Sequence, residues 1–277
     1  MRQIVFGQNV QGASHIRSGT PCQDSYRKKV CDDGAIILAV ADGHSSRMCP
    51  FSSQGSRIAV NVFCSVIRNL YEGYVGNPEQ LLTYLNREGD TRISRAIDTE
   101  WKKRIVECHR KHRREISSLE NGEEDLTGIY SQYGTTLLGL LITKLFVFAF
   151  QLGDGDICYT SGAGLERVIE PEKILGVETH SLSSSNAWEK AVTCVRRISL
   201  EDSLPAMFSL SSDGFANSYG SEEEFRAAII DYLKMINEHG AEAVEENLPS
   251  WLSETSSMGC GDDITMLIAY FAADNEG

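Results

Sequence analysis

The chain is short of positive charge: 26 Lys and Arg residues stand against 39 Asp and Glu in 277 residues, which gives a formal net charge of −13. General nucleic-acid binding depends on Lys and Arg that neutralise phosphates, so this composition argues against a nucleic-acid partner. The chain also lacks an apolar run near the roughly 20 residues that a membrane helix needs. The longest run, residues 136–151, is broken by Lys144 and predicts two strands that turn there. No apolar signal core follows Met1, so we expect a cytoplasmic protein with no membrane partner.

The cysteines and histidines do not have the spacing of a site for soft metal ions. The eight cysteines are scattered without a CxxC pair, and several lie in apolar patterns, as Cys64 does. We interpret them as reduced, mostly structural thiols. Cys108, His109 and His112 have no second ligand pair at zinc-finger spacing, so zinc is not expected there.

The apolar patterns that are present predict a mixed α+β fold in one domain spanning residues 1–277. Short apolar runs predict strands at residues 4–10, 25–30, 35–41, 134–142, 145–152, 157–161, 206–210 and 264–271. Apolar residues spaced four apart predict helices at 53–70, from Pro78, through 93–105, at 222–236 and at 241–252. We expect a helical layer over about 53–119, a loop at 120–128, and an irregular stretch at 162–195 whose surface flap covers about 164–197.

Two surface features leave alternatives open. Residues 102–114 hold seven Lys and Arg, which form either a solvated helix face or a docking surface for an acidic partner. In the expected flap, Trp188 and the Ser-rich turn at 181–186 either contact a partner or pack on the domain itself.

Short acidic segments beside glycine recur along almost the whole chain. They are Cys22-Gln23-Asp24-Ser25, Ala41-Asp42-Gly43-His44, Gly153-Asp154-Gly155-Asp156, Ser211-Ser212-Asp213-Gly214 and Gly261-Asp262-Asp263-Ile264-Thr265. Each one alone is typical of a turn, because Asp hydrogen-bonds to nearby backbone and Gly accepts positive φ. Together they place aspartates at several strand ends, where converging carboxylates would repel one another unless a cation lies between them. Carboxylate oxygens suit Mg²⁺ or Mn²⁺.

In order and spacing, these segments and Gly134-Thr135-Thr136 resemble the motifs of the metal-dependent protein phosphatase 2C family. Gly12-Ala13-Ser14-His15 with Cys22-Gln23-Asp24-Ser25 looks like the version in bacterial members, and the resemblance runs from about residue 4 to 271. It implies a four-layer α-β-β-α sandwich of two antiparallel sheets flanked by helices. It also implies two Mg²⁺ or Mn²⁺ ions in a cleft at one edge.

The resemblance further implies roles for individual residues. Asp42 would bridge both ions and the Gly43 carbonyl would ligate one of them. Asp213 and Asp262 would hold the other ion, and Asp24 would orient metal-bound water. A hydroxide bridging the ions would attack the phosphomonoester directly. Further along the chain, His44 matches the family's proposed general acid, although a histidine at a strand end can also serve structure alone.

The remaining positions follow the family pattern less closely. Asp154 matches a third, weaker metal site, but Asn217 stands where several members carry an Asp for that ion. An arginine that grips phosphate usually precedes the first Asp of the pattern. Here the candidates are Arg17 and His15, and each can equally be a solvated loop residue.

These observations lead to the hypothesis of an Mg²⁺- or Mn²⁺-dependent phosphatase that acts on phosphoserine or phosphothreonine in protein substrates. One rival is a catalytically silent relative that binds a phosphorylated partner. Another is a phosphatase of a small phosphorylated metabolite, because the ions contact only the phosphate.

Overall fold

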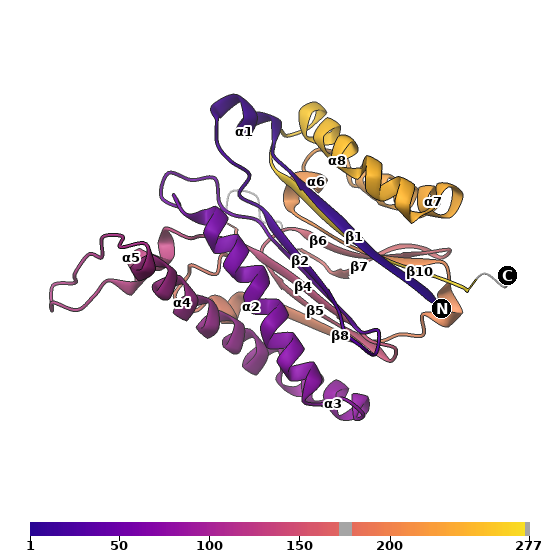
Figure 1. Ribbon diagram of the computed structural model, residues 1–277, viewed down its shortest axis with the longest axis horizontal. Coiled ribbons are helices and arrows are strands. Elements are labelled where there is room, and N and C mark those ends of the chain that lie inside the picture. The colour runs from indigo at the N-terminus through magenta and orange to yellow at the C-terminus, as the bar shows by residue number, and fades with distance from the viewer. Residues whose placement is uncertain (172–178, 275–277) are drawn as a thin grey trace.

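Two five-stranded antiparallel sheets form the centre of the protein, and helices cover the outer face of each (Figure 1). The computed structural model describes residues 1–171 and 179–274. The first sheet has the order β1-β10-β9-β6-β7 and the second the order β2-β3-β4-β5-β8. The strands are β1 (Arg2–Val10), β2 (Ser25–Val30), β3 (Ile36–Ala41), β4 (Leu137–Ile142), β5 (Phe146–Leu152), β6 (Asp156–Ser161), β7 (Gly164–Ile169), β8 (Val192–Arg197), β9 (Ala206–Ser211) and β10 (Ile264–Ala272).

The helices form the two outer layers. They are α1 (Ala13–Ser18), α2 (Ser52–Glu72), α3 (Pro78–Glu88), α4 (Ser94–Lys111), α5 (Leu126–Ser131), α6 (Asp213–Ala216), α7 (Glu222–His239) and α8 (Ala241–Met258). Helices α2, α3 and α4 pack on the second sheet, and α7 and α8 pack on the first. The expected α+β fold with four α-β-β-α layers is confirmed. Within the described chain, no helix combines the length and the apolar character needed to cross a membrane.

Strand β3 shows why several strands are apolar at every position. Its side chains alternate between two cores: Ile36 and Leu38 pack between the sheets, whereas Ile37 and Ala39 pack under the helices. A strand covered on both faces needs no polar side, so its sequence reads as a continuous apolar run. Ile93, Ile97 and Trp101, spaced four apart in the expected helix through 93–105, are buried as well. This stripe therefore belongs to the core.

The expected irregular stretch at 162–195 is wrong in part, because it contains β7 and most of β8. Both strands lie at sheet edges, where β7 pairs with β6 and β8 pairs with β5. Edge strands carry charged side chains that break the apolar pattern, here Glu166 and Arg167 in one strand and Arg196 and Arg197 in the other. The flap expected over 164–197 therefore shrinks to the connection between these strands, and residues 172–178 within it lie outside the described residues.

The boundaries of the helical layer also differ from the expected ones. Helix α4 ends at Lys111 rather than near residue 119, and α5 begins at Leu126 inside the expected loop. Asp125 caps α5 by accepting a hydrogen bond from the backbone N–H of Gly128. This short helix arises from a local cap rather than from an apolar stripe.

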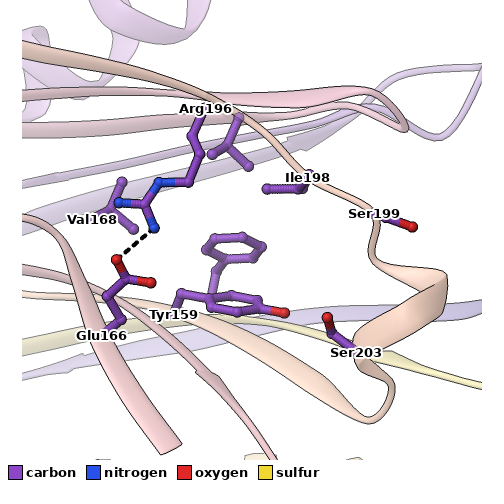
Figure 2. Close-up of a pocket in the computed structure, with 9 residues that line it drawn as sticks. Tyr159, Glu166, Val168, Arg196, Ile198, Ser199 and Ser203 are labelled. Carbon is purple, nitrogen blue, oxygen red and sulfur yellow. Dashed lines mark ion pairs between the residues drawn. The ribbon is translucent and has the colours of Figure 1, made fainter. Parts of the chain in front are cut away.

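A hollow of about 200 Å³ opens between the two sheets on the side of β7 and β8 (Figure 2). Tyr159 and Phe208 contribute aromatic rings to it, and Arg196 forms an ion pair with Glu166 at 2.8 Å between the two edge strands. None of the aspartates of the acidic segments lines this hollow. It is therefore separate from the candidate site.

Candidate metal centre and active site

The turn that follows β3 carries Asp42 and His44, and the Gly-Thr-Thr segment before β4 fixes its backbone. Thr136 donates its N–H to the Asp42 carbonyl at 2.9 Å, and the Thr135 hydroxyl donates to the same oxygen at 2.8 Å. The N–H of His44 donates to the Gly134 carbonyl at 3.1 Å. A Cβ atom at position 134 would lie 2.6 Å from Cδ2 of the His44 ring. The glycine thus leaves the space that the imidazole occupies.

Asp213 and Asp262 are brought together by a close approach of two backbones. Asp213 begins α6 and is separated from the end of β9 by Ser212, and Asp262 precedes β10, the neighbouring strand. A Cβ atom on Gly214 would lie only 2.1 Å from the Asp263 carbonyl oxygen. Only a glycine permits this contact, so the Asp-Gly sequence serves packing here as well as turn formation.

Asp24 is the most buried of the expected site carboxylates, with 5% of the residue exposed. The Ser212 hydroxyl donates to its Oδ2 at 2.8 Å, whereas its Oδ1 is buried without a hydrogen bond in the described chain. Burial raises the pKa of Asp24 to about 7; the charges of Asp263 and Asp213 add to the rise, and the Ser212 and Thr265 hydroxyls partly offset it. A buried carboxyl with an unsatisfied oxygen favours a ligand that brings positive charge.

The other carboxylates form one electrostatic cluster with Asp24. Burial raises the pKa of Asp42 well above its usual range, and the charges of Asp24, Asp213 and Asp262 raise it further. Burial also raises the pKa of Asp213, with contributions from the charges of Asp154 and Asp262. A contact between the Asp42 and Asp213 carboxyl groups raises the pKa of Asp42 and lowers that of Asp213, as expected when Asp42 holds the proton.

This cluster has the donor set of a site for hard divalent cations. No Lys or Arg of the described chain forms an ion pair with the Asp24, Asp42, Asp213 or Asp262 carboxylates, and His15 is the basic side chain near Asp262. Within residues 1–171 and 179–274, no three His, Cys, Asp or Glu side chains are arranged to hold a metal ion as they stand. Binding would thus require carboxylates to exchange their present contacts for a cation, which supplies the missing positive charge.

The residues expected at a third metal site engage neighbouring polar groups. Asp154 accepts a hydrogen bond from the Thr179 hydroxyl at 2.8 Å. Asn217 is exposed, and its Nδ2 donates to Asp213 Oδ2 at 2.8 Å. Asn217 thus holds Asp213 through a neutral amide, where an Asp would add negative charge.

The two candidates for phosphate recognition lie in different surroundings. His15 in α1 is buried, its Nδ1 lies 2.8 Å from Asp263 Oδ1, and its Nε2 lies 3.0 Å from Ser45 Oγ. Arg17 is exposed on the same helix, and its guanidinium forms no ion pair within the described chain. The structure therefore brings His15 to the cluster, with both ring nitrogens engaged by protein groups, and leaves Arg17 at the surface.

Sequence reasoning gave no role to Ser45, Asp263 or Ser212, although all three contact the site. Each one directly adjoins a residue that was singled out, so adjacency in the acidic segments was the available signal. That signal could not indicate which neighbour points toward the cluster, because the contact partners lie far away in the chain.

Much of the basic charge in 102–114 is neutralised within the domain. Lys102 pairs with Asp98 at 2.9 Å, and Arg104 pairs with Glu100 at 2.7 Å, both at the helical i,i+4 spacing. The Arg114 guanidinium stacks on a ring of the same domain at 3.5 Å from the ring centroid. These contacts favour a helix face with its own ion pairs over a docking surface.

Trp188 also packs on the domain itself. It is half-buried, and the Arg95 guanidinium lies 4.1 Å from its ring centroid. This is the geometry of a cation–π contact, and it holds the segment around Trp188 against α4.

Comparison with known proteins places these motifs in a family. The sequence profile described as protein phosphatase 2C matches residues 11–253. The structure is similar to that of the S. agalactiae serine/threonine phosphatase, with 13% identity, a TM-score of 0.59, and coverage of 97% of this chain and 99% of that one. It is similar to the Mycobacterium tuberculosis serine/threonine phosphatase PstP/Ppp, with 15% identity, a TM-score of 0.60, and coverage of 99% and 100%.

A further similar structure is the catalytic domain of PstP in complex with two manganese ions. It shares 14% identity, a TM-score of 0.59, and coverage of 98% of this chain and 99% of that one. At these identities the structures establish the shared fold. A search of the curated proteins finds no match.

Proposed function

Because the chain belongs to the protein phosphatase 2C family, we propose that it is a divalent-metal-dependent phosphatase that hydrolyses phosphoserine and phosphothreonine in protein substrates. The observation that carries this proposal is the cluster of Asp24, Asp42, Asp213 and Asp262, whose mutual repulsion no Lys or Arg of the described chain relieves. A domain that only recognised a partner would have no physical need for it.

The proposed metal ligands are those that the family's motifs imply for these residues. Asp42 would contact two Mg²⁺ or Mn²⁺ ions, with the Gly43 carbonyl on one of them, and Asp213 and Asp262 would hold the other. Asp154 would serve a third ion. When bound, such ions lower the pKa of water and shield the negative charge of a phosphoryl group.

The chain's own side chains supply the remaining functions. His44 would protonate the leaving oxygen of the phosphomonoester, and its ring is set in place by the contact with Gly134 and the backbone hydrogen bond to the same residue. The Asp24 carboxyl group, which accepts a hydrogen bond from the Ser212 hydroxyl, would orient water.

The first test is hydrolysis of an aryl phosphate with Mn²⁺, then with a chelator, and in Asp42→Asn. We expect the chelator to abolish turnover and Asp42→Asn to lower it at least about a hundredfold, because several kcal/mol of charge stabilisation are lost. The matched control is Asp32→Asn, which changes an exposed aspartate outside the site and should retain activity. Robust turnover with chelator, or in Asp42→Asn, would refute the proposal.

A second measurement addresses the substrate class. Phosphopeptides and small phosphate esters are compared by kcat/KM under the same Mn²⁺ conditions. Higher kcat/KM for phosphoserine and phosphothreonine peptides supports a protein phosphatase, whereas preference for a small ester identifies a metabolite phosphatase. Binding of phosphopeptides without turnover of any ester identifies a silent relative.

A further inference from the structure

Three side chains from distant parts of the sequence form a hydrogen-bonded row that ends at the rim of the carboxylate cluster. Asp263 Oδ1 lies 2.8 Å from His15 Nδ1, and His15 Nε2 lies 3.0 Å from Ser45 Oγ. Exposure increases along the row: Asp263 is 4% exposed, His15 is 8% exposed, and Ser45 lies on the surface. The row thus joins a buried anchor to a hydroxyl that faces solvent.

Asp263 is a rigid anchor because three donors fix its carboxylate. Besides His15, the backbone N–H of Gly12 donates to Oδ1 at 2.7 Å, and the N–H of Gln23 donates to Oδ2 at 2.7 Å. These bonds join the α1 segment and the start of β2 to β10. An ionised carboxylate that accepts from Nδ1–H also sets the orientation of the imidazole ring.

Ser45 is held from two sides. Its hydroxyl donates to Gln23 Oε1 at 2.5 Å, and its Oγ also lies 3.0 Å from His15 Nε2. His15 Nε2 also lies 3.7 Å from Asp262 Oδ1, which puts the held hydroxyl beside the proposed metal ligands. Ser45 directly follows His44 in the chain.

We propose that Ser45 donates a hydrogen bond to a non-reacting oxygen of the substrate's phosphoryl group, and that His15 and Asp263 are positioning residues for that hydroxyl. This inference rests on the proposed phosphatase function. When substrate binds, a phosphoryl oxygen replaces Gln23 Oε1 as the acceptor. His15 itself fits less well as the donor, since both of its ring nitrogens are engaged by protein groups.

The order Asp263–His15–Ser45 is also that of a nucleophilic serine with its base, but the Ser45 hydroxyl donates its proton to a different group. A nucleophilic serine donates its proton to the imidazole, whereas here the Ser45 hydroxyl donates to Gln23 Oε1. The geometry thus assigns Ser45 to substrate contact and not to covalent catalysis.

The test measures p-nitrophenyl phosphate hydrolysis with saturating Mn²⁺, and inhibition by inorganic phosphate. Because a hydrogen bond to a charged group is lost, Ser45→Ala should raise KM and the phosphate inhibition constant about tenfold with kcat within about threefold. Ser45→Thr keeps the hydroxyl and should restore most of the binding. Ser46→Ala is the matched control: Ser46 is also exposed, but among the described residues its hydroxyl oxygen accepts only from the Met48 N–H.

A double-mutant cycle tests the positioning role. His15→Ala should raise KM in the wild-type background but add little in the Ser45→Ala background, because the two residues act through one hydroxyl. Additive effects of the two substitutions would overturn the positioning role. Ser45→Ala with wild-type KM and phosphate inhibition would overturn the substrate contact, and so would phosphate covalently attached to Ser45 in a quenched reaction. If Asp42→Asn remains active in the same assay, it is the proposed function that fails.

Discussion

Replacing Asp24 by Asn is expected to stabilise the metal-free protein at alkaline pH while impairing the metal-dependent reaction. In the folded chain the pKa of Asp24 is raised from its ordinary value of 3.8 to about 7, mainly by burial. A carboxyl group with a raised pKa contributes stability below pH 3.8, and that contribution is lost as pH rises through about 7. Above that pH the buried anion opposes folding.

The size of the effect follows from the two pKa values. The difference between 3.8 and about 7, at about 1.4 kcal/mol per pH unit, corresponds to about 4 kcal/mol. With an unfolding entropy of roughly 2 cal/mol/K per residue, that energy raises the melting temperature by about 7 °C. In Asp24→Asn the new amide oxygen would still accept the Ser212 hydrogen bond, so the gain comes mainly from removing the charge.

The assay is thermal unfolding in excess chelator, followed from pH 5 to pH 8.5. The advantage of Asp24→Asn over wild type should grow with pH up to about 7 and then level off. Asp32→Asn removes an exposed carboxylate and should change stability by less than about 0.5 kcal/mol at each pH. An Asp24→Asn variant that is no more stable at pH 8.5, or whose advantage is independent of pH, would refute the electrostatic reasoning.

Two further substitutions test packing at and away from the site. Gly134→Ala would place a Cβ 2.6 Å from the His44 ring. We therefore expect kcat for an aryl phosphate to fall at least about tenfold, with little change in melting temperature. An unchanged kcat would contradict this role of Gly134. Asp156→Ala should destabilise the fold by about 3 kcal/mol in denaturant unfolding, because Arg167, which is mostly buried, loses a 2.6 Å ion pair. A loss below about 1 kcal/mol would show that the remaining partners of Arg167 compensate.

Helices and strands could be predicted from the sequence wherever the spacing of apolar residues reflects which side chains are buried. Continuous apolar runs predicted β3 and the turn at Lys144 between β4 and β5, and spacing by four predicted the Trp101 stripe. The edge strands β7 and β8 were missed, because charged residues such as Glu166 and Arg196 interrupt their apolar pattern.

The candidate site, like the fold, could be predicted from the sequence only in part. The acidic segments by themselves indicated which aspartates end or precede strands, and the structure brings Asp24, Asp42, Asp213 and Asp262 into one electrostatic cluster. Asp154 belongs to the same cluster, because its charge raises the pKa of Asp213. Local sequence suffices for this much because a strand end and a turn are encoded within a few residues.

Tertiary structure alone decided which neighbouring side chains support those aspartates. His15 and Asp263 are 248 positions apart in the chain, and they meet because β1 pairs with β10 over its whole length and carries the following α1 segment to that edge. The sequence could not show which of His15 and Arg17 is buried, since both lie on one short helix and only packing decides burial. The sequence determined an acidic site at strand ends. The pairing of the first and last strands brought His15 to Asp263, because contacts across such a separation depend on strand register rather than on any local pattern. Ser45 joins them from the second sheet, where it follows β3.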